Sequence, residues 1–352
     1  MFHSFPLLVL VLMFVVAAVA VWIAGIQLSN TTDVMSSRFG LGQALGGLIL
    51  LAIATNLPEI AITASAALSN NLGIAIGNIL GGIGIQTVVL VLLDIFGLWR
   101  RDALSYAAAS LELVLEGVLV VAVLILSIMG TQLPKSLIFA RVTPGALLIA
   151  IMWIVGIWLL GKARTDLPWQ EKGRAPDTLH KNPGEKTKDT TQKWSTPHVV
   201  IVFAIAAVVT LVAGVVLEES GNAIATHIGL SGVLFGSTVL AAATSLPELS
   251  TGLASAKAGA YNLAFSDIFG GNAFLPVLFL FATLLSGQAV LPQAKNTDIY
   301  LAGLGILLTT VYIAGLIFRP KRQVFHMGID SLIVLLLYIL GVIGLFAIAS
   351  FS

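Results

Sequence analysis

Long apolar runs recur along the whole chain, and short polar connections separate them. A helix needs about 20 mostly apolar residues to cross a hydrocarbon core roughly 30 Å thick, and each run meets that length. We therefore predict an all-α integral membrane protein with ten transmembrane helices. The ten predicted spans are Phe5–Leu28, Gly40–Ala66, Leu72–Phe96, Ala103–Leu126, Leu137–Leu160, Pro197–Leu217, Leu230–Ala256, Tyr261–Leu285, Thr297–Phe318 and Gly328–Ser350.

Composition supports this interpretation and excludes other classes of protein. Of the 352 residues, 58% are apolar and only 10% are charged, whereas a soluble domain carries about 25% charged residues. A cytosolic enzyme is therefore excluded. The net charge of +1 gives no sign of a nucleic-acid partner, and the absence of cysteine excludes disulfides and thiolate chemistry. The chain also lacks a phosphate-binding Gly-x-x-x-x-Gly-Lys-Ser/Thr motif, so we expect no nucleotide partner.

Lysine and arginine residues indicate the orientation in the membrane. Cytoplasmic connections of membrane proteins are enriched in these residues. If the N-terminus lies outside, only Lys135, Arg141 and Lys295 of the eighteen cationic residues fall on the outer side. We therefore predict that both termini lie outside and that the central loop is cytoplasmic, in what we expect to be a prokaryotic cell (inner) membrane surrounded by lipid bilayer.

The chain contains an internal repeat. With a shift of 189 residues, Gly25–Gly82 aligns with Gly214–Gly271 without a gap, and 18 of the 58 aligned positions are identical. The shared residues include a Thr-x-Leu-Pro-Glu motif at Thr55–Glu59 and Thr244–Glu248. Because each half holds five predicted spans, an odd number, the two copies must cross the membrane in opposite directions. This is an inverted repeat, an architecture in which transporters bind substrate near the membrane midplane.

A polar segment separates the two halves. Residues 162–196 are rich in Lys, Asp, Glu, Thr and Pro, which is typical of a flexible linker. We predict a first repeat at residues 1–161, a cytoplasmic linker at 162–196 and a second repeat at 197–352, each repeat with five transmembrane helices.

The repeated motif carries oxygen ligands into the membrane. Pro58 and Pro247 each lack an N–H, so the carbonyl four residues earlier loses its helical partner. Thr55 and Glu59 lie four residues apart, as do Thr244 and Glu248, so each pair shares one helix face. The inverted repeat brings the two sets together as an all-oxygen site, which suits Ca²⁺.

Two further polar residues extend this site. Asn78 and Asp267 are equivalent in the repeat and lie in the spans that follow the motifs, where small residues permit close helix contact.

A buried carboxylate costs about 2.5–3.5 kcal/mol or more at the bilayer centre, so a divalent cation between the two glutamates would explain why both are present. Protons or two or more Na⁺ ions would compete for the same charges, which is the physical basis of antiport.

These motifs resemble the alpha repeats of the sodium/calcium exchanger (cation/Ca²⁺ antiporter) superfamily. In that family a Gly-Thr-Ser-Leu-Pro-Glu motif is followed by a Gly-Ser-Asn-Ile-Phe-like motif in the next helix. The resemblance implies that Glu59 and Glu248 bind Ca²⁺, with the remaining ion ligands among Thr55, Thr244, Asn56, Ser245, Asn78, Asp267 and Asn272. It implies no cofactor, inorganic cations as partners, and an exchanger rather than an enzyme.

The second motif departs from the family pattern. It reads Gly81-Gly82-Ile83 in the first half and Gly270-Gly271-Asn272 in the second, so one expected Asn and both expected Ser residues are absent. Such losses weaken monovalent sites more than the central divalent site, and they leave the coupling ion open.

Other functions remain as alternatives. An exchanger of another cation coupled to H⁺ or K⁺ would use the same acids, and a cation channel would need a continuous polar pore. An intramembrane hydrolase would need a catalytic pair that the spans lack, and a scaffold would not need buried acids in both halves.

Glu112 and Glu116 lie four apart in the fourth span, where they either share a proton or form a peripheral ion path. Asp94 and Asp330 lie near span ends, where we expect the membrane interface. The oligomeric state is not predicted.

Overall fold

The computed structural model describes residues 2–38, 53–97, 103–108, 110–163, 194–230, 232–257 and 259–351. This part of the chain is helical apart from short connections and one two-stranded hairpin. The first-half elements are η1 (Phe2–Ser4), α1 (Leu7–Arg38), α3 (Leu57–Leu68), α4 (Leu72–Gly97), α5 (Leu104–Ala108), α6 (Leu111–Thr131) and α7 (Pro144–Ala163).

The second half begins with α9 (Thr196–Ile228), which is followed by a strongly interrupted segment. That segment consists of α10 (Gly232–Phe235), the π-helical turn η3 (Gly236–Leu240), α11 (Ala241–Thr244) and α12 (Leu246–Lys257). The remaining elements are α13 (Tyr261–Phe274), η4 (Leu275–Val277), α14 (Leu278–Ser286), η5 (Leu291–Gln293), α15 (Asn296–Phe318), β1 (Gln323–Val324), β2 (Met327–Gly328) and α16 (Ile329–Phe351).

Eight helices in the described ranges are long and apolar enough to cross a membrane, and they coincide with eight of the ten predicted spans. They are α1, α4, α6, α7, α9, the continuous α13–α14 unit, α15 and α16. The predicted spans Gly40–Ala66 and Leu230–Ala256 are instead broken into shorter pieces. The described part of the former comprises a helical turn at 53–55 and α3, and residues 40–52 lie outside the described residues.

Several predicted span ends differ from the observed ones for local reasons. The fourth predicted span divides into α5 and α6, because the Ser110 side chain caps a new helix by accepting a hydrogen bond from Leu113 N at 3.3 Å. The fifth begins at Pro144, whose fixed φ suits the first turn of a helix. The sixth continues to Ile228 instead of stopping at Leu217, because the helix accommodates two acidic residues that the apolar run excluded.

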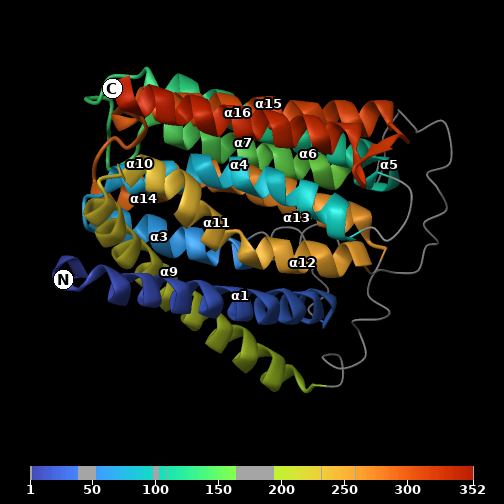
Figure 1. The fold of residues 1–352 in the computed structure, drawn as a ribbon, viewed down its shortest axis with the longest axis horizontal. Helices are drawn as coiled ribbons and strands as arrows, with labels where there is room; N and C mark the ends of the chain where they lie inside the picture. Colours follow the sequence, from blue (N-terminus) through green and yellow to red (C-terminus); the bar gives the residue numbers. More distant parts are fainter. Residues whose placement is uncertain are drawn as a thin grey trace.

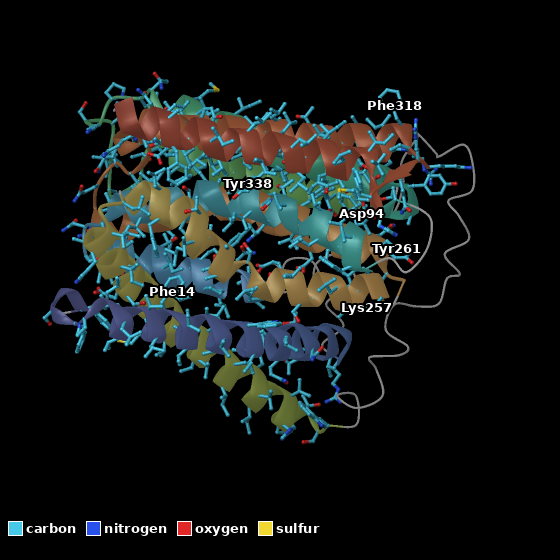
Figure 2. All side chains as sticks on the ribbon, viewed as in Figure 1. Phe14, Asp94, Lys257, Tyr261, Phe318 and Tyr338 are labelled. Atoms are coloured by element: carbon cyan, nitrogen blue, oxygen red, sulfur yellow. The ribbon has the colours of Figure 1, made fainter. Side chains whose placement is uncertain are left out.

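The helices form a stack with the broken elements in the middle (Figure 1). α1 and α9 pack along each other on one side, and α6, α7, α15 and α16 form the opposite side. Both chain termini lie at one end of the stack, here called the terminal face. The opposite end is called the α5 face, and Figure 2 places Asp94, Lys257, Tyr261 and Phe318 there.

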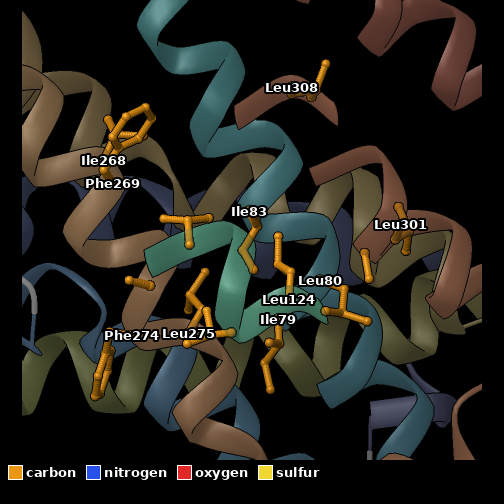
Figure 3. Close-up of a cluster of buried hydrophobic side chains, with 14 of the residues drawn as sticks. Ile79, Leu80, Ile83, Leu124, Ile268, Phe269, Phe274, Leu275, Leu301 and Leu308 are labelled. Carbon is orange, nitrogen blue, oxygen red and sulfur yellow. The ribbon is translucent and has the colours of Figure 1, made fainter. Parts of the chain in front are cut away.

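The large apolar core joins α4, α6, α13 and α15. Figure 3 shows part of it, with Ile83 of α4 beside Leu124 of α6 and Leu275. Leu301 and Leu308 of α15 belong to the same cluster. This core fixes α4 and α13, the helices that follow the two broken segments, against the body of the protein.

Two glycine contacts position the broken segments. A Cβ added at Gly25 of α1 would lie 2.5 Å from the Cβ of Pro247, and one at Gly214 of α9 would lie 3.1 Å from the carbonyl oxygen of Pro58. Gly25 and Gly214 are equivalent in the repeat, as are the two prolines. Each long outer helix therefore packs at a glycine against the proline of the other half.

Candidate cation site

The two Thr-x-Leu-Pro-Glu motifs break their helices with nearly the same backbone geometry. Asn56 has φ −87° and ψ 13°, and its counterpart Ser245 has φ −82° and ψ 3°. In both copies the helix resumes one residue later, and Pro58 and Pro247 have no N–H to offer the carbonyls of Ala54 and Ala243. These carbonyl oxygens are thereby available for another partner.

The two glutamates occupy the first turns of the resumed helices. Glu59 lies in α3 and Glu248 in α12, and both side chains are 0% exposed. All four of their carboxylate oxygens are buried without a hydrogen-bond partner among the described residues. The N-terminal turn of a helix favours negative charge, which offsets part of the cost of burying these groups.

The two halves meet at these acids. The Thr244 side chain lies beside the Glu59 carboxyl, while its hydroxyl donates to the Ala241 carbonyl at 3.1 Å. Glu248 is close enough to Glu59 and to Asp267 for their charges to interact. No three acidic or histidine side chains in the described ranges form a compact metal-binding cluster. A cation between the glutamates would therefore also need hydroxyl, amide and backbone oxygens.

Asp267 is held at the edge of this centre. Its Oδ2 accepts a hydrogen bond from Thr251 Oγ1 at 2.7 Å, and the side chain is 4% exposed. Thr251 lies one turn after Glu248 on α12, so this bond ties α13 to the broken helix. Its repeat counterpart Asn78 is completely buried, and neither polar atom of its side chain has a hydrogen-bond partner in the described structure.

Two residues that depart from the family motifs, Asn56 and Gly271, lie next to each other. A Cβ on Gly271 would lie 3.0 Å from Asn56 Nδ2 and 3.4 Å from Gln86 Oε1. A serine at Gly271 would therefore crowd both amides. The larger Asn56 and the smaller Gly271 compensate in size, and two amide side chains occupy the region of the missing serine.

The two residues at the Asn position of the second motif have different surroundings. Asn272 is buried and donates from Nδ2 to Thr87 Oγ1 at 3.2 Å. Its counterpart Ile83 lies in the apolar core, where a Cβ on Gly305 would be 3.1 Å from Ile83 Cγ2 (Figure 3). The difference makes the site asymmetric at this position.

All nine residues predicted to bind ions are at most 4% exposed. The contacts above bring Glu59, Thr244, Glu248 and Asp267 together, and place Asn56 beside Gly271. Thr55 and Ser245 are buried at the helix breaks, and Ser245 Oγ donates to the Ala241 carbonyl at 2.8 Å. The described contacts do not place Asn78 or Asn272 in direct contact with a glutamate.

Sequence reasoning missed Gln86 and Thr251. Gln86 is completely buried, with both side-chain polar atoms lacking a partner among the described residues. Gln86 could have been recognised in the sequence, because it is an amide residue inside a strongly apolar span. Thr251 was recognisable only by its position one turn after Glu248.

Three of the other acids, Glu116, Asp94 and Asp330, are also buried. Glu116 accepts a hydrogen bond from Ser266 Oγ at 2.8 Å and therefore faces α13, whereas Glu112 is half-buried. Asp94 and Asp330 are 1% and 4% exposed, and Asp94 lies at the α5 face (Figure 2), so the protein itself buries these acids near the helix ends. Asp94 accepts hydrogen bonds from the backbone N–H groups of Leu104 and Gly328 at 2.8 and 2.6 Å, which joins α4 to α5 and to the β hairpin.

The fold resembles solved cation exchangers. An H⁺/Ca²⁺ exchanger, CAX, superposes with a TM-score of 0.66 at 16% identity, covering 97% of this chain and 82% of that one. The sodium-calcium exchanger NCX_Mj superposes with a TM-score of 0.59 at 17% identity, covering 96% and 99%. At these identities the likeness concerns the fold.

Sequence relatives and a family match give the same assignment. The inner membrane protein YrbG of Escherichia coli (strain K12) is 26% identical over 84% of this chain and 85% of its own length. The putative antiporter CaxA of Alkalimonas amylolytica is 28% identical over 75% and 78%. Residues 9–163 and 198–347 match the family described as sodium/calcium exchanger protein. This integral membrane protein therefore belongs to the sodium/calcium exchanger protein family, a family of cation antiporters, as its repeated motifs predicted.

Proposed function

We propose that this protein is a secondary active antiporter that exchanges Ca²⁺ for Na⁺ or H⁺ by alternating access. The observation that carries the proposal is the pair of fully buried glutamates at equivalent helix breaks. Two carboxylates in low dielectric repel each other, and a divalent cation between them cancels both charges. Oxygen from Thr55, Thr244, Asn56, Ser245 and the freed carbonyls completes a set of hard ligands.

The arrangement of the halves supports an inverted repeat of five helices each. α3 leads toward the terminal face (Figure 1), whereas α12 leads to Lys257 at the α5 face (Figure 2). Equivalent broken helices thus run in opposite directions. We assign the first repeat to residues 1–161, the linker to 162–196 and the second repeat to 197–352.

Solved structures with a similar fold include exchangers that use different coupling ions. CAX is an H⁺/Ca²⁺ exchanger, whereas NCX_Mj is a sodium-calcium exchanger. In this chain Asp267 and Asn272 give the second half more polar ligands than Asn78 and Ile83 give the first. We place the coupling ion on the Asp267 side of the site.

Transport by purified protein in liposomes tests the function. Radiolabelled Ca²⁺ uptake is measured under an outward gradient of Na⁺, H⁺ or K⁺, each imposed separately, with protein-free liposomes as the control. We expect a Na⁺ or H⁺ gradient to drive Ca²⁺ accumulation. Ca²⁺ entry that is insensitive to all three gradients would indicate a channel, and no entry under any gradient would contradict Ca²⁺ exchange.

We also predict the orientation of the protein in the membrane: the terminal face should lie outside the cell. The chain has no cysteine, so single cysteines can be introduced without a background. Asn70→Cys and Thr226→Cys, both exposed, should react with an impermeant thiol reagent added to intact cells. Lys321→Cys, exposed beyond α15, should react only after permeabilisation, and the opposite pattern would reverse the assigned orientation.

A further inference from the structure

A third buried glutamate lies outside the candidate cation site. Glu218 of α9 is 0% exposed, although the apolar pattern ended the sixth span at Leu217 and left this acid in a connection. It follows Gly214 by one helical turn, and Gly214 packs on Pro58. Glu218 therefore faces α3 one turn further toward the terminal face than the helix break.

The surroundings of Glu218 offer oxygen ligands. Its Oε2 accepts a hydrogen bond from Ser65 Oγ at 2.8 Å, and the side chain of Asn71, just before α4, is also close. Its Oε1 is buried and has no hydrogen-bond partner in the described structure. The charge of Glu219, the next residue along α9, acts on Glu218 and is also negative. A carboxylate, a hydroxyl and an amide are side-chain types typical of hard-cation sites.

The position relates this group to the glutamates at the centre. Ser65 follows Glu59 by six residues on α3, a rise of about 9 Å in a regular helix. Asn71 lies at the end of α3 that leads to the terminal face. Along the axis of α3, Ser65 and Asn71 therefore lie between Glu59 and the terminal face, and Glu218 lies beside Ser65.

We propose that Glu218, Ser65 and Asn71 form a second cation site, through which the transported divalent cation passes between the terminal face and Glu59. The proposal rests on the proposed function and adds a ligand group specific to one side of the membrane. A buried carboxylate next to another acid is costly to retain, and a passing cation provides a reason for its charge. The competing explanation is that the Ser65–Glu218 hydrogen bond only fastens α3 to α9.

Exchange measured separately from each face distinguishes these explanations. Glu218→Gln keeps the shape and an acceptor for Ser65 but removes the charge. We expect it to raise the half-saturating Ca²⁺ concentration at the terminal face about tenfold. Removing a carboxylate that faces a divalent ion in low dielectric should weaken binding of that ion at least about tenfold. The half-saturating Ca²⁺ concentration at the α5 face and the maximal exchange rate should both change less than about twofold, because the ligands of the central site are intact.

Three further variants make the test specific. Glu219→Gln removes the neighbouring, half-buried charge, which acts on Glu218 only through its field, and should raise the terminal-face value by a smaller factor than Glu218→Gln while leaving the α5 face unchanged. Ser65→Ala and Asn71→Ala each remove one neutral ligand and should raise the terminal-face value by a smaller factor. These two variants also test the site if Glu218→Gln does not fold, which size-exclusion chromatography would reveal.

The outcomes separate the two proposals. Wild-type exchange with unchanged values at both faces for Glu218→Gln would overturn the second site and leave the proposed function intact. A lowered melting temperature for Ser65→Ala, with wild-type Ca²⁺ affinity in every variant, would show that the hydrogen bond is only a fastening. Absence of Ca²⁺ exchange by the wild-type protein would instead contradict the proposed function.

Discussion

Glutamine at either Glu59 or Glu248 is expected to reduce Ca²⁺ exchange at least about a hundredfold while leaving the protein folded. Both substitutions keep the size of the side chain, and neither carboxylate has a hydrogen bond in the described structure that the amide would lose. The change therefore acts on charge. A divalent cation at the site would retain a net positive charge in low dielectric, and it would bind far more weakly.

Initial rates of Ca²⁺ uptake into proteoliposomes measure this effect, with the amount of folded protein determined by size-exclusion chromatography. Glu112→Gln is the matched control, because Glu112 is a half-buried acid of α6, a helix that carries neither of the two breaks. It should keep most of the wild-type rate. Full activity of both Glu59→Gln and Glu248→Gln would show that the cation binds elsewhere.

Gly81→Ala is expected to be the most damaging small substitution for stability. Gly81 of α4 packs directly on the π-helical turn η3, and an added Cβ would overlap the backbone of Ser237. Because backbone cannot rotate away as a side chain can, α4 and the interrupted segment must separate. Overpacking of a core usually costs about 1–3 kcal/mol, and a clash with backbone should reach or exceed that range.

The neighbouring glycine provides the control. A Cβ on Gly82 would lie 3.4 Å from Leu275 Cδ1, which is an ordinary contact with the movable end of a side chain. Gly82→Ala should therefore be purified at wild-type yield, whereas Gly81→Ala should show a lower melting temperature and aggregate on size-exclusion chromatography. Equal melting temperatures for the two variants would mean that α4 and η3 do not pack as described.

Apolar pattern predicted the long helices because lipid contact and burial both select for apolar residues over a full span. The same reasoning failed where a polar group is accommodated inside the fold. The span of α9 was ended before Glu218 because an isolated acid is unfavourable in lipid, whereas the folded protein surrounds it. The interruption at η3 contains no proline to mark it in the sequence, and it packs closely against α4 at Gly81 and Gly236.

The candidate site was predictable to the extent that it is repeated. Glu59 and Glu248, with their threonines and prolines, were found because both halves retain them. Asn272 was predicted from the family motif, although Ile83 replaces it in the first half. Gln86, Thr251 and Glu218 were missed because neither the motif nor the repeat marks them: a shift of 189 places Gln86 on Leu275, Thr251 on Ile62 and Glu218 on Ser29. Their roles depend on which helices pack together, and that information is absent from the comparison of one half with the other.

The reciprocal contacts of Gly25 with Pro247 and of Gly214 with Pro58 have a consequence for how the molecule can be divided. Each half carries its own binding motif, yet the support for that motif belongs to the opposite half. Neither half is therefore a self-sufficient module, and a separately produced half would expose an unsupported proline break. Two polypeptides cut within the central segment would regain a working centre only as a complementary pair, and two copies of the same half could do so only by reproducing both contacts at once.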